Sequence, residues 1–125
     1  MKPGKVLVVD DEPEVRQVLL EFLSSRGYDV TAASGGVEAL AFVESEKPDL
    51  VLLDVAMPDM DGVETLRRIV AINPGLAVIM VTANANISIT SKLLALGAVD
   101  YVPKPFDLDY LDQAVSIQVT AAQDR

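Results

Sequence analysis

The sequence predicts an α/β protein with a doubly wound sheet of five mainly parallel strands and five helices. Two observations lead to this fold class. Short apolar runs rich in Val, Ile and Leu alternate with longer segments whose apolar residues recur every three or four positions. Parallel strands need long, right-handed crossovers of this kind. The 125 residues, of which 50% are hydrophobic, suit a single domain over residues 1–125 with a sizeable core.

Five short runs are expected to be the strands. Three of them are apolar throughout, as strands covered on both faces should be. The run at 28–32 (YDVTA) is more polar and fits an edge strand. In chain order the predicted strands are 5–9, 28–32, 50–54, 77–82 and 100–103.

Five helical patterns fill the intervals and the end of the chain. The first has an apolar stripe formed by Val15, Val18, Leu19, Phe22 and Leu23, and Gly27 is a natural end for it. The last is the weakest by propensity because it is rich in β-branched residues. The predicted helices are 14–26, a segment within 35–46, 62–72, 86–96 and 108–122.

Composition excludes several kinds of site. The chain has no Cys and no His, which rules out disulfides, thiolate metal sites and triads built on imidazole. A net charge of -9 and a pI of about 4.3 argue against electrostatic binding of nucleic acid. No apolar run approaches the roughly 20 residues that cross a bilayer, and acidic residues come too early for a secretory signal. We therefore expect a cytoplasmic protein that binds neither membrane nor nucleic acid directly.

Reactive side chains stand at the carboxyl ends of four predicted strands. In doubly wound sheets, ligand sites lie beyond this edge. Taken alone, each aspartate could equally be a helix N-cap, and a lone Thr or Lys there is more often structural or solvated. Together they form one rim, made of Asp10, Asp11, Asp54, Thr82 and Lys104.

Gathering carboxylates at one rim costs free energy. Two like charges about 4 Å apart repel by about 4 kcal/mol at an effective dielectric constant of about 20. A divalent cation with hard oxygen ligands would offset this repulsion. Mg²⁺ typically binds one or two carboxylates together with waters and phosphate oxygens, so the rim predicts Mg²⁺ as the cofactor.

Four motifs on this repeat make the chain resemble a response-regulator receiver domain of two-component signalling. They are VLVVDDEP at 6–13, LLDVAMPDMDG at 52–62, VTAN at 81–84 and GAVDYVPKPF at 97–106. The resemblance covers nearly the whole chain and implies a flavodoxin-like fold with strand order 2-1-3-4-5. It leaves open whether a longer regulator continues beyond residue 125.

The resemblance also implies roles for the rim. Asp54 is expected to be the phosphoacceptor, with its carboxylate as the nucleophile. Mg²⁺ is expected on Asp11, on Asp54 and on the backbone carbonyl of Ala56, with Asp10 acting mainly through a water. Lys104 is expected to pair with a phosphoryl oxygen.

Further roles come with the same resemblance. Thr82 and Tyr101 are expected to move together as a switch. Ala56 and Asn84 match positions that tune how fast the phosphoryl group hydrolyses. The bond between Lys104 and Pro105 is expected to be cis. From their local sequence, Asp59 and Asp61 are expected to be loop and N-cap residues and not metal ligands.

The fourth predicted helix has two apolar sides. One side, with Ile89, Leu93 and Leu96, fits the core. The other carries Ile87, Thr90 and Leu94, which either extend a widely buried helix or join Tyr101 in a partly apolar partner surface. The expected partners are a sensor histidine kinase or phosphotransfer protein and a downstream output domain or protein. Dimerisation on phosphorylation stays open, although the acidic start of the last helix gives little support to a salt-bridged dimer.

The function expected from these residues is a phosphorylation-activated signalling switch. Such a domain is regulatory rather than an enzyme, and it catalyses only its own phosphorylation and dephosphorylation. Two alternatives remain: an interaction module that has lost phosphorylation, and a Mg²⁺-dependent phosphohydrolase with an aspartyl-phosphate intermediate. Those hydrolases need a second acid two residues after the nucleophile, where this chain has Ala56.

Overall fold

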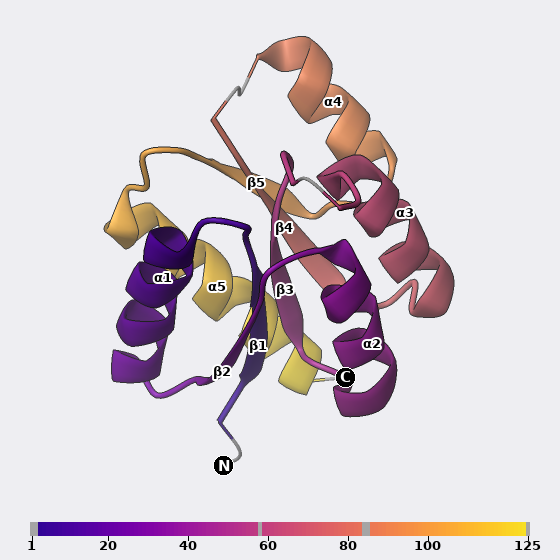
Figure 1. The fold of residues 1–125 in the computed structure, drawn as a ribbon. Coiled ribbons are helices and arrows are strands. Elements are labelled where there is room, and N and C mark those ends of the chain that lie inside the picture. The colour runs from indigo at the N-terminus through magenta and orange to yellow at the C-terminus, as the bar shows by residue number, and fades with distance from the viewer. Residues whose placement is uncertain (1–2, 58, 84–85, 125) are drawn as a thin grey trace.

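The fold is a five-stranded sheet with helices on both faces, as the sequence predicts (Figure 1). The computed structural model describes residues 3–57, 59–83 and 86–124. The sheet order is β2-β1-β3-β4-β5, and every neighbouring pair is parallel. The strands are β1 (Lys5–Val9), β2 (Asp29–Ala33), β3 (Leu50–Asp54), β4 (Ala77–Thr82) and β5 (Asp100–Pro103).

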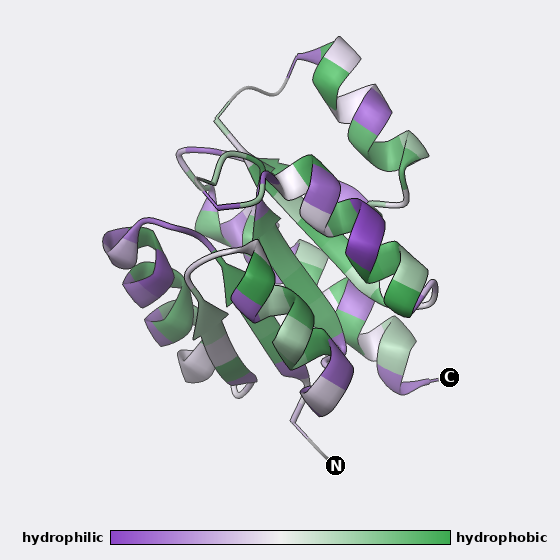
Figure 2. Cartoon of the chain, turned by 45° about the vertical axis from the view of Figure 1, so that its right-hand side comes forward, coloured by the Kyte–Doolittle hydropathy of each residue, from purple (hydrophilic) through white to green (hydrophobic). Residues whose placement is uncertain are grey.

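Two helices cover one face of the sheet and three cover the other, as Figure 1 shows. The helices are α1 (Pro13–Ser25), α2 (Gly36–Glu46), α3 (Gly62–Ile72), α4 (Ile87–Ala95) and α5 (Leu108–Gln123). Alternate strand residues point to opposite faces. Leu7 and Val51 therefore pack with the helices α2, α3 and α4, whereas Val6 and Leu50 pack with α1 and α5. Figure 2 shows the resulting apolar sheet between helices with polar outer sides.

Several details differ from the sequence-based expectation, among them the ends of α1, α4 and α5, each by one residue. β2 begins at Asp29, one residue later than predicted, because the N–H of Tyr28 still donates to the carbonyl of Leu23 at the end of α1 (3.2 Å). Val18 was assigned to the buried stripe of α1 but is 48% exposed. Leu19 and Leu23 alone fill the fully buried part of that stripe, because α1 lies against the β2 side of the sheet.

The helices of the described segments are also short of what a membrane span needs. Within these segments, no helix combines the length and the apolar character that crossing a bilayer requires.

Candidate functional site

The strand register brings the predicted rim residues together at one edge of the sheet. Val9 of β1 pairs with Leu53 of β3, so the residues that follow them, Asp10 and Asp54, lie next to each other. Thr82, at the end of β4, pairs with Pro103 of β5. This is the carboxyl edge, where the order of the strands reverses beside β1.

Lys104 lies at the centre of the charged side chains. Its Nζ lies 3.0 Å from Oδ2 of Asp10, and 3.5 Å from both Oε1 of Glu12 and Oδ1 of Asp54. Its backbone N–H donates to the carbonyl of Thr82 (2.8 Å), which fixes the residue beside β4. The peptide bond between Lys104 and Pro105 is cis. One ammonium thus contacts three carboxylates.

Asp10 is held by bonds from both directions along the chain. Its carboxylate is 1% exposed, and Oδ1 accepts the N–H of Glu12 (2.9 Å) while Oδ2 accepts from Lys104. Nη1 of Arg16, one turn into α1, donates to the carbonyl of Asp10 (2.7 Å). A buried charge is tolerated only with such partners. Asp10 is therefore a fixed part of the site, whereas Asp11 is exposed.

Asp54 lies in an environment that disfavours its charge. The residue is 4% exposed. Burial, followed by the negative charge of Asp10, raises the pKa of Asp54 to about 6, although Lys104 and the N–H of Ala56 act in the opposite direction. Burial favours the neutral amine of Lys104, but its bond to Asp10 and the nearby carboxylates raise its pKa. The site therefore has an excess of negative charge that one lysine does not balance.

The donor set suits a hard divalent cation. Carboxylate oxygens of Asp10, Asp11 and Glu12 come within 4.8 Å of one another, and Asp54 lies beside them across Lys104. All of these ligands are oxygens, which Mg²⁺ prefers to nitrogen or sulfur. We call this group the acidic rim: Asp10, Asp11, Glu12, Asp54 and Lys104. Its charge and its chemistry both fit Mg²⁺.

Glu12 is the member of the acidic rim that the sequence did not single out as a site residue. It was considered as a cap for the first helix, and it does occupy the N-cap position of α1, but its side chain makes no capping bond. The side chain approaches Lys104 instead. The available signal was three consecutive acids directly after a buried strand.

The loop after Asp54 is closely packed at its end. Asp61 is the N-cap of α3 and accepts the N–H of Glu64 (2.8 Å). The N–H of Gly62 donates to the carbonyl of Val55 (2.7 Å), and a Cβ at Gly62 would collide with the carbonyl oxygen of Asp54. Only glycine allows this approach, which keeps the start of α3 close to Asp54.

The predicted partner surface is only partly exposed. Ile87 is 84% exposed and Leu94 44%, and Tyr101 on β5 is half-buried, so we call these three residues the apolar face. Thr90 does not belong to it: its exposure is 6%, and its hydroxyl donates to the carbonyl of Asn86 (3.1 Å). Thr90 and Leu93 both point inward from α4, because residues three positions apart lie on one side of a helix.

Asn84, expected to tune hydrolysis, lies outside the described residues.

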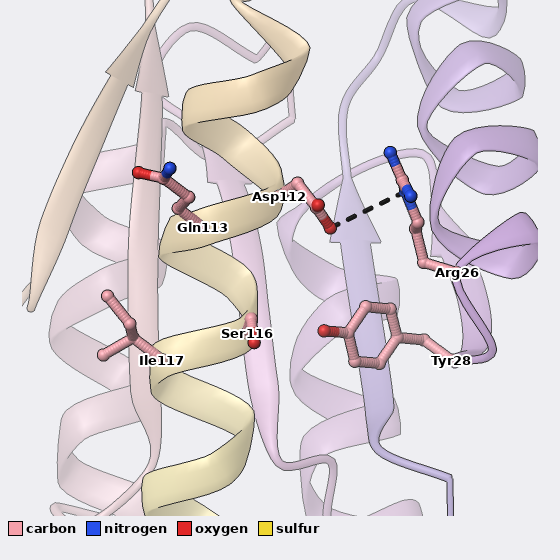
Figure 3. Close-up of a pocket in the computed structure, with 6 residues that line it drawn as sticks. All are labelled: Arg26, Tyr28, Asp112, Gln113, Ser116 and Ile117. Atoms are coloured by element: carbon pink, nitrogen blue, oxygen red, sulfur yellow. Dashed lines mark ion pairs between the residues drawn. The ribbon is translucent and has the colours of Figure 1, made fainter.

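A shallow cleft lies elsewhere, between α5 and the turn before β2 (Figure 3). Its volume is about 360 Å³, and Nε of Arg26 pairs across it with Oδ1 of Asp112 at 3.8 Å. The guanidinium of Arg26 also lies 5.2 Å from the ring centre of Phe22. No rim residue lines the cleft, so it is separate from the candidate site.

Comparison with known families decides the identity of the fold. The model of the response regulator receiver domain matches residues 6–116. The chain belongs to this family. It is therefore the receiver domain of a two-component response regulator, a regulatory domain of phosphorylation-type signalling. The family binds Mg²⁺ at an acidic pocket, to which the cluster of Asp10, Asp11 and Glu12 corresponds.

Individual relatives agree with this family. Sporulation initiation phosphotransferase F of Bacillus subtilis is 40% identical over 115 residues, which cover 92% of this chain and 93% of that protein. Response regulator MprA of Mycobacterium sp. (strain KMS) is 43% identical over 109 residues, 87% of this chain and 47% of MprA. The receiver domain thus spans about half the length of MprA.

Solved receiver structures superpose closely on the chain. A CheY-like receiver domain protein from Methanospirillum hungatei JF-1 has a TM-score of 0.92 and 30% identity, with 98% of each chain covered. NtrX from Brucella abortus has a TM-score of 0.90 and 30% identity, over 98% of this chain but 28% of NtrX. The receiver fold therefore occurs both alone and as part of longer proteins.

Proposed function

We propose that Asp54 accepts a phosphoryl group, with Mg²⁺, from the phosphohistidine of a sensor histidine kinase or phosphotransfer protein. Residues 1–125 would act as one receiver domain whose output passes through the surface of α4, β5 and α5 to a downstream domain or protein. The observation that carries this proposal is the position of Lys104, whose Nζ lies within 3.5 Å of Asp54 and 3.0 Å of Asp10 in a largely buried site.

The chain's own residues would divide the chemistry. An oxygen of the Asp54 carboxylate would attack phosphorus, and the bond from phosphorus to the donor nitrogen would break with its electron pair going to that nitrogen. The attack needs the ionised carboxylate, and a bound cation would favour that form by opposing the burial and the charge of Asp10 that raise the pKa of Asp54 in the metal-free site. Lys104 would pair with a phosphoryl oxygen as charge moves onto the transferred group.

The residues proposed for the metal are those that the family resemblance implies. Asp11, Asp54 and the backbone carbonyl of Ala56 would hold Mg²⁺, and Asp10 would act mainly through a water. When bound, Mg²⁺ neutralises charge on the carboxylates and on the phosphoryl oxygens and helps to orient them. Ala56 is exposed beside the phosphoacceptor, and its N–H lies close enough to lower the pKa of Asp54.

Intact-mass spectrometry with a small phosphodonor such as acetyl phosphate tests this proposal. We expect one phosphoryl adduct that requires Mg²⁺ and is absent from Asp54→Ala. Asp49→Ala is the matched control, since Asp49 lies before β3 at the opposite end of the same strand and should leave the adduct unchanged. No adduct with any donor would indicate an interaction module, and continuous release of phosphate from varied esters would indicate a hydrolase.

The output part of the proposal has its own test. Phosphorylation would bias an existing two-state equilibrium, with Thr82 and Tyr101 changing position together. Hydrogen exchange of backbone amides in α4 and β5 should therefore change when Asp54 is phosphorylated. Ile87→Asp and Leu94→Asp should keep the adduct but weaken partner binding or dimerisation. If these variants left every interaction unchanged, the apolar face would not be the output surface.

A further inference from the structure

Asp59, in the loop between β3 and α3, caps a helix that is distant in sequence. Its Oδ1 accepts the N–H of Gly36 and its Oδ2 accepts the N–H of Val37, each at 3.3 Å. These are the first N–H groups of α2, whose own N-cap residue, Gly35, has no side chain to bind them. Bonds from backbone N–H groups, that of Met60 first and then that of Val37, hold the pKa of Asp59 below its usual range.

The two glycines at the start of α2, Gly35 and Gly36, leave space for this loop. A Cβ at Gly35 would lie 2.6 Å from both carboxylate oxygens of Asp59. Gly35 has φ -169 and ψ 178, an extended conformation that any residue adopts, so its backbone does not need glycine. Position 35 must lack a side chain only because the Asp59 carboxylate occupies the space that a Cβ would fill. At Gly36 a Cβ would meet Cβ of Met60 at 3.1 Å, so the loop lies close against both glycines.

The same loop carries Ala56, the proposed carbonyl ligand of Mg²⁺. At its start, the N–H of Val55 donates to the carbonyl of Val81 (3.1 Å), and at its end Gly62 bonds back to Val55 (2.7 Å). Asp59 adds an anchor between these two points, from the loop to a separate helix. Met57 of this loop packs in the hydrophobic core, and Asp59 adds the polar contact that joins the loop to the backbone of α2.

We propose that Asp59 is a positioning residue for the metal site, which holds the β3–α3 loop against the start of α2 so that Ala56 stays in place beside Asp54. This inference rests on the proposed function, because it assigns Asp59 a role through the Ala56 carbonyl. This role differs from that of a helix cap that contributes only to stability. A cap of that kind would affect α2 but not the affinity for Mg²⁺.

Calorimetric titration of the full chain with Mg²⁺ distinguishes the two roles. We expect Asp59→Ala to weaken Mg²⁺ binding by about three- to tenfold, which is less than the roughly 10–100-fold lost when residues that bond directly to metal ligands are removed. Asp59→Asn keeps one acceptor oxygen and should lie closer to the wild type. Asp49→Ala is the control, because Asp49 also accepts a backbone N–H across elements, from Lys5 at 2.9 Å, but at the other end of β3.

Gly35→Ala provides a second, independent disruption. Its methyl group would displace the Asp59 carboxylate without straining the backbone, so it should weaken Mg²⁺ binding as Asp59→Ala does. The double variant should be no weaker than the stronger single variant, since both remove one contact. Additive losses would overturn the inference.

The wild type separates failure of this inference from failure of the proposed function. If the wild type binds Mg²⁺ and forms the adduct, while Asp59→Ala loses stability but binds Mg²⁺ within about twofold of the wild type, the positioning role alone is wrong. If the wild type neither binds Mg²⁺ nor forms an adduct, the proposed function fails and the positioning role fails with it.

Discussion

At the acidic rim, two carboxylates are buried, because Asp10 is 1% and Asp54 4% exposed, and the ammonium of Lys104 contacts both. On the apolar face, in contrast, apolar side chains are exposed: Ile87 is 84% and Leu94 44% exposed. Both arrangements cost free energy in the isolated domain, the first through desolvated charge and the second through apolar contact with water. A ligand could relieve each cost, which is consistent with the proposal of an ion at the acidic rim and a protein on the apolar face.

The two regions also differ in how firmly they are built. The acidic rim is fixed by the ends of neighbouring strands, with Lys104 tied to β4 through its N–H and Asp10 tied to α1 through Arg16. The apolar face lies mainly on α4, of which Thr90 and Leu93 are the buried residues. Several elements therefore hold the acidic rim, whereas α4 is held through one packed side. This difference is consistent with the proposal that the rim acts on the surface of α4.

The largest effect should come from removing the ammonium group of Lys104. Lys104→Ala should slow formation of the phosphoryl adduct by roughly 100-fold, because loss of one donor to a developing charge costs about 2.7–4 kcal/mol. Lys92→Ala, an exposed lysine on α4, is the matched control and should keep the wild-type rate. The measurement is the initial rate of adduct formation by intact mass at saturating Mg²⁺. Equal rates for both variants would mean that Lys104 has no part in the transfer.

A smaller effect should separate the two sides of α4. Leu93→Ala should lower the free energy of unfolding by about 2–3 kcal/mol, because Leu93 is fully buried against the sheet. Ile87→Ala should change it by less than about 0.5 kcal/mol, as expected for an exposed side chain. Urea unfolding followed by far-UV circular dichroism measures both. A loss at Ile87 that matched the loss at Leu93 would mean that the apolar face is packed rather than free.

The smallest effect concerns the charge of Asp54 itself. Its pKa in the folded protein is about 6, above the value of 3.8 for the free side chain, so the folded state binds more protons between these pH values. Stability from this group is therefore present at low pH and is lost as pH rises from about 4 to 6. Linkage limits the penalty at pH 7 to about 3 kcal/mol, and solvent screening at the rim reduces it to about 1–2 kcal/mol.

Asp54→Asn removes this penalty. In the metal-free protein, it should raise the free energy of unfolding by about 1–2 kcal/mol at pH 7 and by almost nothing below pH 4. Urea unfolding in EDTA across this pH range measures the difference. Added Mg²⁺ should then stabilise the wild type more than the variant, because the ion binds the folded state through the carboxylate that the variant lacks. A difference that stayed constant with pH would place its cause outside the ionisation of Asp54.

The acidic rim could be predicted from the sequence because the order of strands and helices determines where the strand ends lie. Parallel strands end at one edge, so residues at the ends of β1, β3, β4 and β5 had to converge once the order of elements was known. Four of the five strands have the predicted bounds, and β2 differs by one residue because Tyr28 is still bonded to α1.

The remaining features depend on contacts that no local pattern encodes. Helical spacing gives the relative positions of Ile87, Thr90 and Leu94 but not the rotation of α4 on the sheet, so it leaves open whether Thr90 is buried or exposed. For the same reason, the spacing predicts a buried Val18 that the structure exposes. No local pattern marks Asp59 as more than a loop residue, since its partners on α2 lie 23 and 22 positions away. Helix rotation and long-range capping both need the tertiary structure.

Locating the phosphoryl group on the chain tests the central claim most directly. The protein is treated with acetyl phosphate and Mg²⁺, reduced with borohydride, which converts an aspartyl phosphate to homoserine, and mapped by peptide mass spectrometry. We predict homoserine at position 54 alone, and only when both Mg²⁺ and the donor are present. An unmodified Asp54, or homoserine at Asp10, Asp11 or another acid in its place, would contradict the assignment of Asp54 as the phosphoacceptor.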